Sequence, residues 1–117
     1  MAPALSVALR LGRVSNLPTV WTNTLVGVTL AGGAALDARV PILLAAFSLF
    51  YIGGMFLNDA FDREFDARTR PDRPIPAGQV TASTVFRSGF GMLGMGVLLL
   101  VMVGYAFAKG TGWLAPA

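Results

Sequence analysis

The chain has 117 residues, of which 55% are hydrophobic, and its net charge is +3 at pH 7. It contains neither cysteine nor histidine, which excludes thiol nucleophiles, imidazole bases and the usual zinc ligands. A mean hydropathy of +0.66 points to the bilayer, and basic residues clustered between apolar runs fit membrane topology better than nucleic-acid binding.

Residues 1–13 form a short, mildly amphipathic entry that carries Arg10 and Arg13. The apolar run that follows is too long for a signal peptide and has Pro18 inside it, so we expect the entry to be retained. No charged residue occurs from 14 to 36, which at about 1.5 Å per residue is enough to cross a hydrocarbon core of about 30 Å. We predict the first membrane span there.

Polar residues interrupt the first half of this predicted span. Asn16, Thr19 and Asn23 are three and four residues apart and therefore share one face of a helix. Polar groups at that depth face a neighbouring helix or a wet cavity. Interhelical hydrogen bonding and the lining of a substrate pocket both explain this face.

The second predicted span covers residues 40–62 and follows a turn at Gly32 and Gly33. Pro41 suits the first turn of a helix, and the span reaches full length if the helix continues into the acidic segment that follows. Gly53 and Gly54 either allow a neighbouring helix to approach closely or widen a pocket.

The segment from 58 to 78 holds five of the six acidic residues and four of the nine basic ones. If the helix continues to about residue 66, then Asn58, Asp59, Asp62 and Asp66 lie within an arc of about 100° on one face. Three carboxylates that face the same space repel one another unless a cation lies between them.

Oxygen ligands of this kind suit Mg²⁺, which is usually held by one or two carboxylates and keeps its other positions for water and phosphate oxygens. The pattern therefore predicts that Asp59, Asp62 and Asp66 hold Mg²⁺ and, through it, a diphosphate. The alternative is a set of solvated charges at a helix end.

Three prolines between residues 71 and 76 end the helix and make a stiff loop, which we place at 63–81. Arg70 and Arg73 in this loop have planar donor forks that suit phosphate oxygens. The loop is expected either to cap the diphosphate or to act as a plain connector with positive charge.

The third predicted span covers residues 82–108, and Lys109 and Trp113 mark its far interface. A stripe of four glycines in this span predicts tight helix contacts. Seven arginines fall on one side of the membrane and only Arg39 and Lys109 on the other, so the amino terminus and the 63–81 loop are predicted to be cytoplasmic. The glycines of the stripe are Gly89, Gly91, Gly94 and Gly96.

The whole string from 58 to 78 resembles the first aspartate-rich motif of the UbiA family of intramembrane prenyltransferases, N-D-x-x-D-x-x-x-D followed by R-P-x-R-P-I-P-x-G. The stretch from Arg13 to Pro18 is similar to the start of helix one in that family, whose asparagine commonly faces the cavity. The matching motif residues are Asn58, Asp59, Asp62, Asp66, Arg70, Pro71, Arg73, Pro74, Ile75, Pro76 and Gly78.

The resemblance implies an all-α transmembrane bundle, in which residues 1–117 form one partial domain equivalent to the first three helices of the family fold. It implies transfer of an isoprenyl group from an allylic diphosphate to an aromatic or lipid acceptor, with Mg²⁺ bridging the aspartates and the diphosphate. The implied catalytic and metal residues are Asp59, Asp62 and Asp66, and the implied substrate-binding residues are Asn58, Arg70, Arg73 and Asn16.

Family members have two similar halves, each with an aspartate-rich motif, whereas no acidic residue follows Asp72 in this chain. We therefore expect the N-terminal portion of a longer transferase of the inner or plasma membrane, inactive by itself. The alternatives are a half-enzyme that needs a partner chain or self-association, and a non-catalytic small membrane protein. The acceptor stays open, because similar strings occur in ether-lipid, chlorophyll-type and quinone-forming members.

Overall fold

The computed structural model describes residues 4–33 and 37–108, and the regular elements in these ranges are all helical. The predicted all-α class is confirmed. Lys109 and Trp113, the predicted far interface, lie outside the described residues. The elements are α1 (Ala4–Gly12), the 3-10 helix η1 (Val14–Asn16), α2 (Leu17–Leu30), α3 (Val40–Phe61), α4 (Arg63–Thr69) and α5 (Ala82–Ala108).

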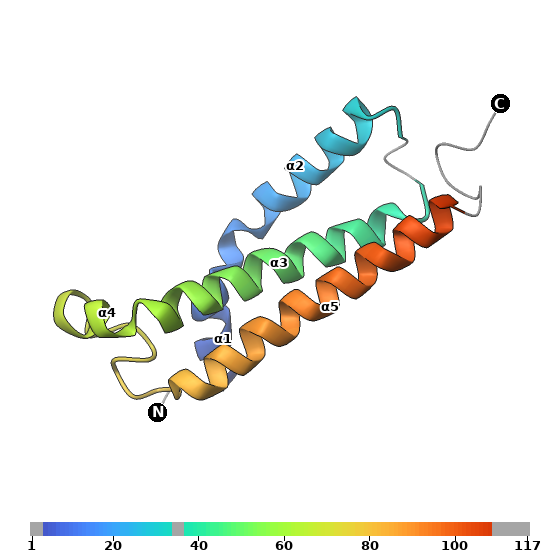
Figure 1. Cartoon of the computed structure of the whole chain (residues 1–117). Coiled ribbons are helices and arrows are strands. Elements are labelled where there is room, and N and C mark those ends of the chain that lie inside the picture. Colours follow the sequence, from blue (N-terminus) through green and yellow to red (C-terminus); the bar gives the residue numbers. More distant parts are fainter. Residues whose placement is uncertain (1–3, 34–36, 109–117) are drawn as a thin grey trace.

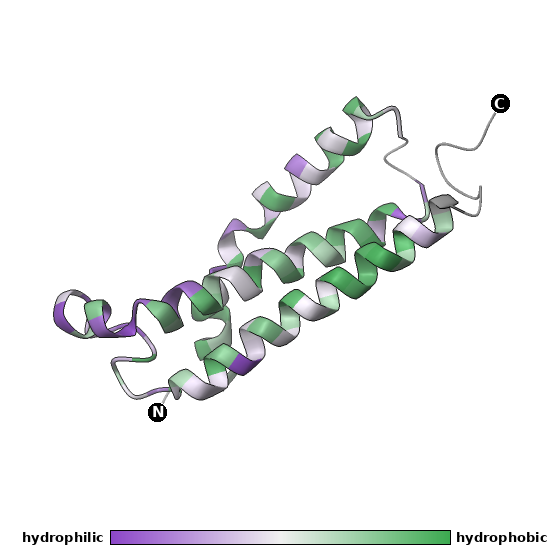
Figure 2. Ribbon diagram, viewed as in Figure 1, coloured by the Kyte–Doolittle hydropathy of each residue, from purple (hydrophilic) through white to green (hydrophobic). Residues whose placement is uncertain are grey.

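The antiparallel pair of α3 and α5 forms the long axis of the molecule (Figure 1). Both helices are long and apolar enough to cross a membrane, and they coincide with the spans predicted at 40–62 and 82–108. The 22 residues of α3 extend about 33 Å, which matches a hydrocarbon core of about 30 Å. Hydrophobic residues cover most of both helices, and hydrophilic ones gather around α4 (Figure 2).

Glycines bring α3 and α5 unusually close together. A Cβ built on Gly89 would lie 2.8 Å from Cγ of Leu57, and one built on Gly96 would lie 2.8 Å from Cε1 of Phe50. The other two glycines of the predicted stripe have open space around them. The tight contact expected for this stripe therefore exists at two of its four positions.

The first predicted span, at 14–36, has a different structure. The helix α2 has 14 residues, or about 21 Å, and it is not among the helices of the described chain that are long and apolar enough to span a bilayer. It ends because Gly32 adopts a left-handed φ of +89°. The N–H of Gly33 then bonds the carbonyl of Val28 at 2.9 Å, which closes the last turn of the helix.

The upper end of α2 leans away from α3 (Figure 1). Indole Nε1 of Trp21 donates a 2.7 Å hydrogen bond to the hydroxyl of Ser48 and ties the two helices together. A groove of about 550 Å³ lies between them, with Asn23 and Thr24 on one side and Leu43 and Phe47 on the other. One member of the polar face predicted for the first span therefore lines this groove.

The core lies where α1 crosses α3 and α5. Its buried members are Val7, Leu11, Phe56, Ala60 and Val85. One face of α1 joins the core through Val7 and Leu11, whereas Leu5 and Leu9 on another face are exposed.

The segment after α3 is almost a continuation of that helix. The N–H of Asp62 bonds the carbonyl of Asn58 at 3.0 Å, and the N–H of Asp66 bonds the carbonyl of Asp62 at 2.8 Å. Asp62 itself has φ −89° and ψ 7°, outside the helical range, so the chain bends there before α4 begins. Beyond α4, the loop returns to the core through Ile75 and Val80.

Candidate active site

Two aspartates at the junction of α3 and α4 are buried. Asp59 is 4% exposed and Asp66 is 1% exposed. Their spacing of seven residues places them on the same side of the chain despite the bend at Asp62. Because a buried carboxylate is costly unless it is paired, the partners of these two side chains define the site.

Arg73, from the loop after α4, connects the two buried aspartates. Its Nη1 lies 3.2 Å from Oδ1 of Asp59 and 3.3 Å from Oδ2 of Asp66. A single guanidinium nitrogen is therefore shared between two carboxylates. The loop predicted at 63–81, for which a cap over a diphosphate and a plain connector were the two alternatives, contacts the acidic motif through this side chain.

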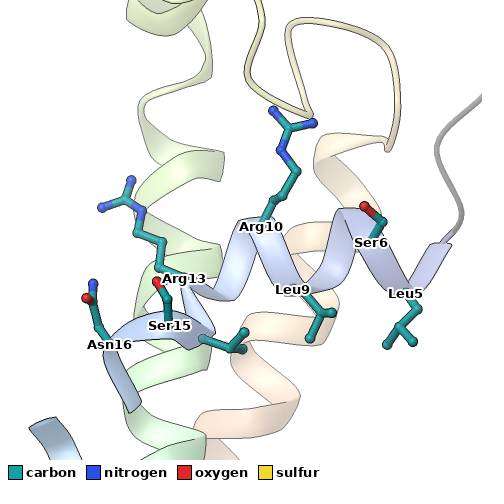
Figure 3. Close-up of a pocket in the computed structure, with 8 residues that line it drawn as sticks. Leu5, Ser6, Leu9, Arg10, Arg13, Ser15 and Asn16 are labelled. Carbon is teal, nitrogen blue, oxygen red and sulfur yellow. The ribbon is translucent and has the colours of Figure 1, made fainter. Parts of the chain in front are cut away.

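Arg13, at the end of α1, is the second partner of Asp59, with Nη2 2.9 Å from Oδ1. Its backbone has φ 48° and ψ 49°, a left-handed conformation that is unusual for a residue with a side chain. The preceding Gly12 allows α1 to approach α3, because a Cβ there would lie 2.8 Å from Cγ2 of Ile52. These two features direct the Arg13 side chain toward α3 (Figure 3).

Asp66 has one oxygen, Oδ1, that is buried and has no hydrogen-bond partner. An unpaired buried acceptor costs about 1–3 kcal/mol, so it marks a place where a further cation or donor is favoured. A hard carboxylate oxygen suits Mg²⁺, and both contacts of Asp59 with arginine fall on Oδ1. The chemistry of the Asp59 and Asp66 donors is therefore compatible with a magnesium ion.

The three carboxylates predicted to face one space do not converge. Within residues 4–33 and 37–108, no three acidic, histidine or cysteine side chains are grouped so that they could hold a metal ion together. Asp62 is exposed, whereas Asp59 and Asp66 meet on Arg73. The physical reason is the bend at Asp62, which interrupts the single helical face on which the prediction depended.

The remaining predicted residues lie around this pair. The side chain of Asn58 is exposed, and so is that of Arg70, whose backbone N–H caps α4 by bonding the carbonyl of Asp66 at 2.7 Å. Asn16 donates a 3.0 Å hydrogen bond from Nδ2 to the hydroxyl of Tyr51 on α3. Asn16 therefore makes an interhelical hydrogen bond, and it also lines a hollow beside α1.

Two arginines of the amino-terminal entry belong to the site although the sequence suggested no such role. Arg13 contacts Asp59, and Arg10 donates to the Gln79 side chain and to the carbonyl of Asp72, each at 3.2 Å. The only signal for Arg10 in the sequence is its position just before an apolar run, whereas Arg13 also begins the stretch that resembles the start of helix one in the UbiA family.

An open hollow of about 790 Å³ lies beside these arginines. Figure 3 shows Arg10 and Arg13 extending from one side of α1, and Leu5 and Leu9 from the other. Asn16 also lines the hollow. Cationic donors and apolar side chains therefore extend from different sides of α1 around this hollow.

Residues 20–117 match the model of the UbiA prenyltransferase family, and the chain belongs to this family. The match includes both buried aspartates and Arg73, whereas Arg13 and Asn16 precede it. Members of the family are membrane proteins built as helical bundles, in agreement with the two apolar helices found here.

Several curated relatives are named digeranylgeranylglyceryl phosphate synthase. The chain is 33% identical to that of Metallosphaera sedula over 83% of its own length and 34% of the relative's. It is 34% identical to that of Methanopyrus kandleri over 81% of its length and 35% of the relative's, and 38% identical to that of Methanothrix thermoacetophila over 62% and 28%. The chain thus spans about a third of the length of these relatives. No solved structure matches it.

Proposed function

We propose that this chain forms the part of a Mg²⁺-dependent prenyltransferase that holds the diphosphate of an allylic isoprenyl donor. The observation that supports the proposal most strongly is the buried pair of Asp59 and Asp66, joined by Arg73, with Oδ1 of Asp66 left without a partner. Membership of the UbiA prenyltransferase family supplies the reaction class.

Asp59 and Asp66 would hold the magnesium ion, and Asp62 would reach it or its water ligands from the exposed side of the bend. When bound, the ion would neutralise the charge that grows on the departing diphosphate. Asn58 would orient the site, and Arg70 and Arg73 would donate to phosphate oxygens that face away from the aspartates.

The proposed reaction breaks the bond between the allylic carbon and the diphosphate oxygen, and both electrons leave with the diphosphate. The acceptor then forms a bond to the allylic carbon and releases a proton. Donors held in place by the fold stabilise the leaving group, and apolar surroundings keep water away from the reactive carbon. Arg10 and Arg13, which line the hollow, are consistent with the first of these needs.

The acceptor is proposed from the relatives. Their name, digeranylgeranylglyceryl phosphate synthase, favours a lipid acceptor based on glyceryl phosphate and an isoprenyl donor of the geranylgeranyl class. Because the chain spans about a third of these relatives, the walls of the prenyl chamber and a second acidic motif would come from outside these residues. They could belong to the same polypeptide, a partner chain or another copy.

The experiment is a transfer assay with radiolabelled geranylgeranyl diphosphate and a glyceryl phosphate lipid, in Mg²⁺ or in EDTA. It is run on the full chain and on a chimaera in which this chain replaces the matched third of the Metallosphaera sedula relative. Asp59→Asn and Asp66→Asn are expected to lower transfer by about 100-fold or more, and EDTA is expected to abolish it.

Asp72→Asn is the matched control, because Asp72 is exposed and is contacted by Arg10 only through its backbone carbonyl. It should retain transfer. Transfer that survives both Asp59→Asn and Asp66→Asn would overturn the proposed metal clamp. A chimaera that folds but never transfers would instead favour a non-catalytic membrane protein.

A further inference from the structure

Four charged side chains at the junction of α3 and α4 form a balanced set. Asp59 and Asp66 supply two negative charges, and Arg13 and Arg73 supply two positive ones. The two arginines come from opposite directions along the chain, one from the end of α1 and one from the loop after α4. Their contacts with the carboxylates differ in quality.

Arg13 has the better contact. Its distance of 2.9 Å to Asp59 is normal for a charge-assisted hydrogen bond, for which about 2.7–2.9 Å is usual. Arg73 uses one nitrogen for two carboxylates, at 3.2 and 3.3 Å, and therefore makes two long contacts in place of one good one. Arg73 is the cation of the set that can be exchanged most easily.

We propose that Arg73 and a divalent cation compete for the same two carboxylates, so that cation binding releases the Arg73 guanidinium while Arg13 stays on Asp59 as a positioning residue. This inference rests on the proposed function, because it takes Asp59 and Asp66 as the metal-binding pair.

The exchange is favoured by charge and by donor chemistry. A dication is attracted to the pair twice as strongly as a guanidinium at equal distance. It can also use Oδ1 of Asp66, the buried oxygen to which no hydrogen-bond donor is directed. An arginine donates hydrogen bonds only along its N–H bonds, whereas a small cation can be coordinated by oxygen atoms from several directions.

The backbone of the loop stays in place when the Arg73 side chain leaves. Arg10 holds the carbonyl of Asp72 and the side chain of Gln79, and Ile75 and Val80 pack against the core. The released guanidinium therefore remains beside the site. Its next partners are anionic oxygens that bind together with the cation, which assigns Arg73 first to the carboxylates and then to a diphosphate.

The test uses Mn²⁺ as the probe and the full chain purified in detergent micelles. Electron paramagnetic resonance measures free Mn²⁺, and phenylglyoxal labelling followed by mass spectrometry measures the reactivity of each arginine. Arg73→Gln is expected to bind Mn²⁺ about tenfold more tightly than the unchanged chain, since the competing hydrogen bonds are lost. Arg68→Gln, which alters an exposed arginine five residues away, should bind as the unchanged chain does.

In the unchanged chain, saturating Mn²⁺ should speed the labelling of Arg73 several-fold and leave Arg68 unaffected. Asp59→Asn combined with Asp66→Asn should make Arg73 equally reactive with and without Mn²⁺. The exchange is overturned if Mn²⁺ binds the unchanged chain and Arg73→Gln equally tightly and does not speed the labelling of Arg73. The proposed metal site would not be affected by that result. If Mn²⁺ binds neither the unchanged chain nor Arg73→Gln, both the exchange and the proposed metal site are overturned.

Discussion

Gly53 of α3 and Gly89 of α5 meet backbone to backbone: a Cβ built on Gly53 would lie 2.9 Å from the carbonyl oxygen of Gly89. The side chains of Met92 and Leu93 flank this contact, with Cβ of Met92 3.1 Å and Cδ2 of Leu93 3.4 Å from the same Cβ position. The contact is six residues before Asp59, so it fixes the end of α3 that carries the buried aspartates. A fixed backbone here is a condition for holding two carboxylates on one cation.

Gly53→Ala should destabilise the protein by about 1–3 kcal/mol, because the new methyl group meets backbone that cannot move aside easily. Gly54→Ala is the matched control, since a Cβ there meets nothing within 4 Å and alanine has the higher helix propensity. Thermal unfolding in detergent, followed by circular dichroism, compares the two. Equal melting temperatures would contradict the close contact.

Thr81 caps the amino-terminal end of α5. Its hydroxyl accepts a 3.2 Å hydrogen bond from the N–H of Thr84, and the two hydroxyls lie 2.8 Å apart. Thr81→Ala should therefore lower the free energy of unfolding by about 1 kcal/mol, while Thr81→Ser should keep most of the stability. Chemical denaturation in mixed micelles measures the free energy of unfolding of both variants. Equal losses of stability in Thr81→Ser and Thr81→Ala would argue against capping.

Arg10→Ala should loosen the loop without disturbing the buried aspartates. The side chain of Arg10 holds Asp72 and Gln79, whereas Arg73 makes its own contacts. Hydrogen exchange at the loop amides should accelerate by about fivefold, as expected for the loss of about 1 kcal/mol of hydrogen bonding. Arg87→Ala is the control because Arg87 bonds Ser83 within its own helix. Unchanged exchange in Arg10→Ala would show that the ion pairs of Arg73 and the apolar contacts hold the loop without Arg10.

Ser48→Ala should release Trp21 from α3. The hydroxyl of Ser48 accepts from the indole at 2.7 Å and donates to the carbonyl of Leu44 at 2.7 Å, so both bonds are lost together. In a Trp113→Phe background only Trp21 emits, and its fluorescence should become easier to quench with iodide. Ser83→Ala, on α5, should leave the emission unchanged. Identical quenching in the two serine variants would mean that α2 does not depend on this bond.

Uninterrupted apolar runs predicted α3 and α5 well because length and hydropathy decide whether a helix can span a bilayer. The same criterion overestimated the helix in the first span. Gly32 takes a left-handed conformation and ends α2 at the turn that the sequence predicted there, whereas the length of the apolar run extended the span past it.

The acidic pair was accessible from the sequence because Asp59 and Asp66 are seven residues apart on one helical face. The exposed position of Asp62 could not be predicted from the sequence, since it depends on a bend at this single residue. Arg13 was missed for another reason. It is 46 residues from Asp59, and local patterns do not specify which distant charges will pair. Only the packing of α1 on α3, through Gly12, brings them together.

The left-handed backbone of Arg13 affects how this protein can be engineered. Arg13→Gly would relieve about 1 kcal/mol of conformational strain in the backbone, whereas removing one partner of a buried ion pair costs about 3–5 kcal/mol. That variant would lose the guanidinium that holds Asp59. Mutant libraries designed to raise thermal stability should therefore keep Arg13 unchanged. Glycine suits the left-handed backbone at this position but lacks the side chain that pairs with Asp59.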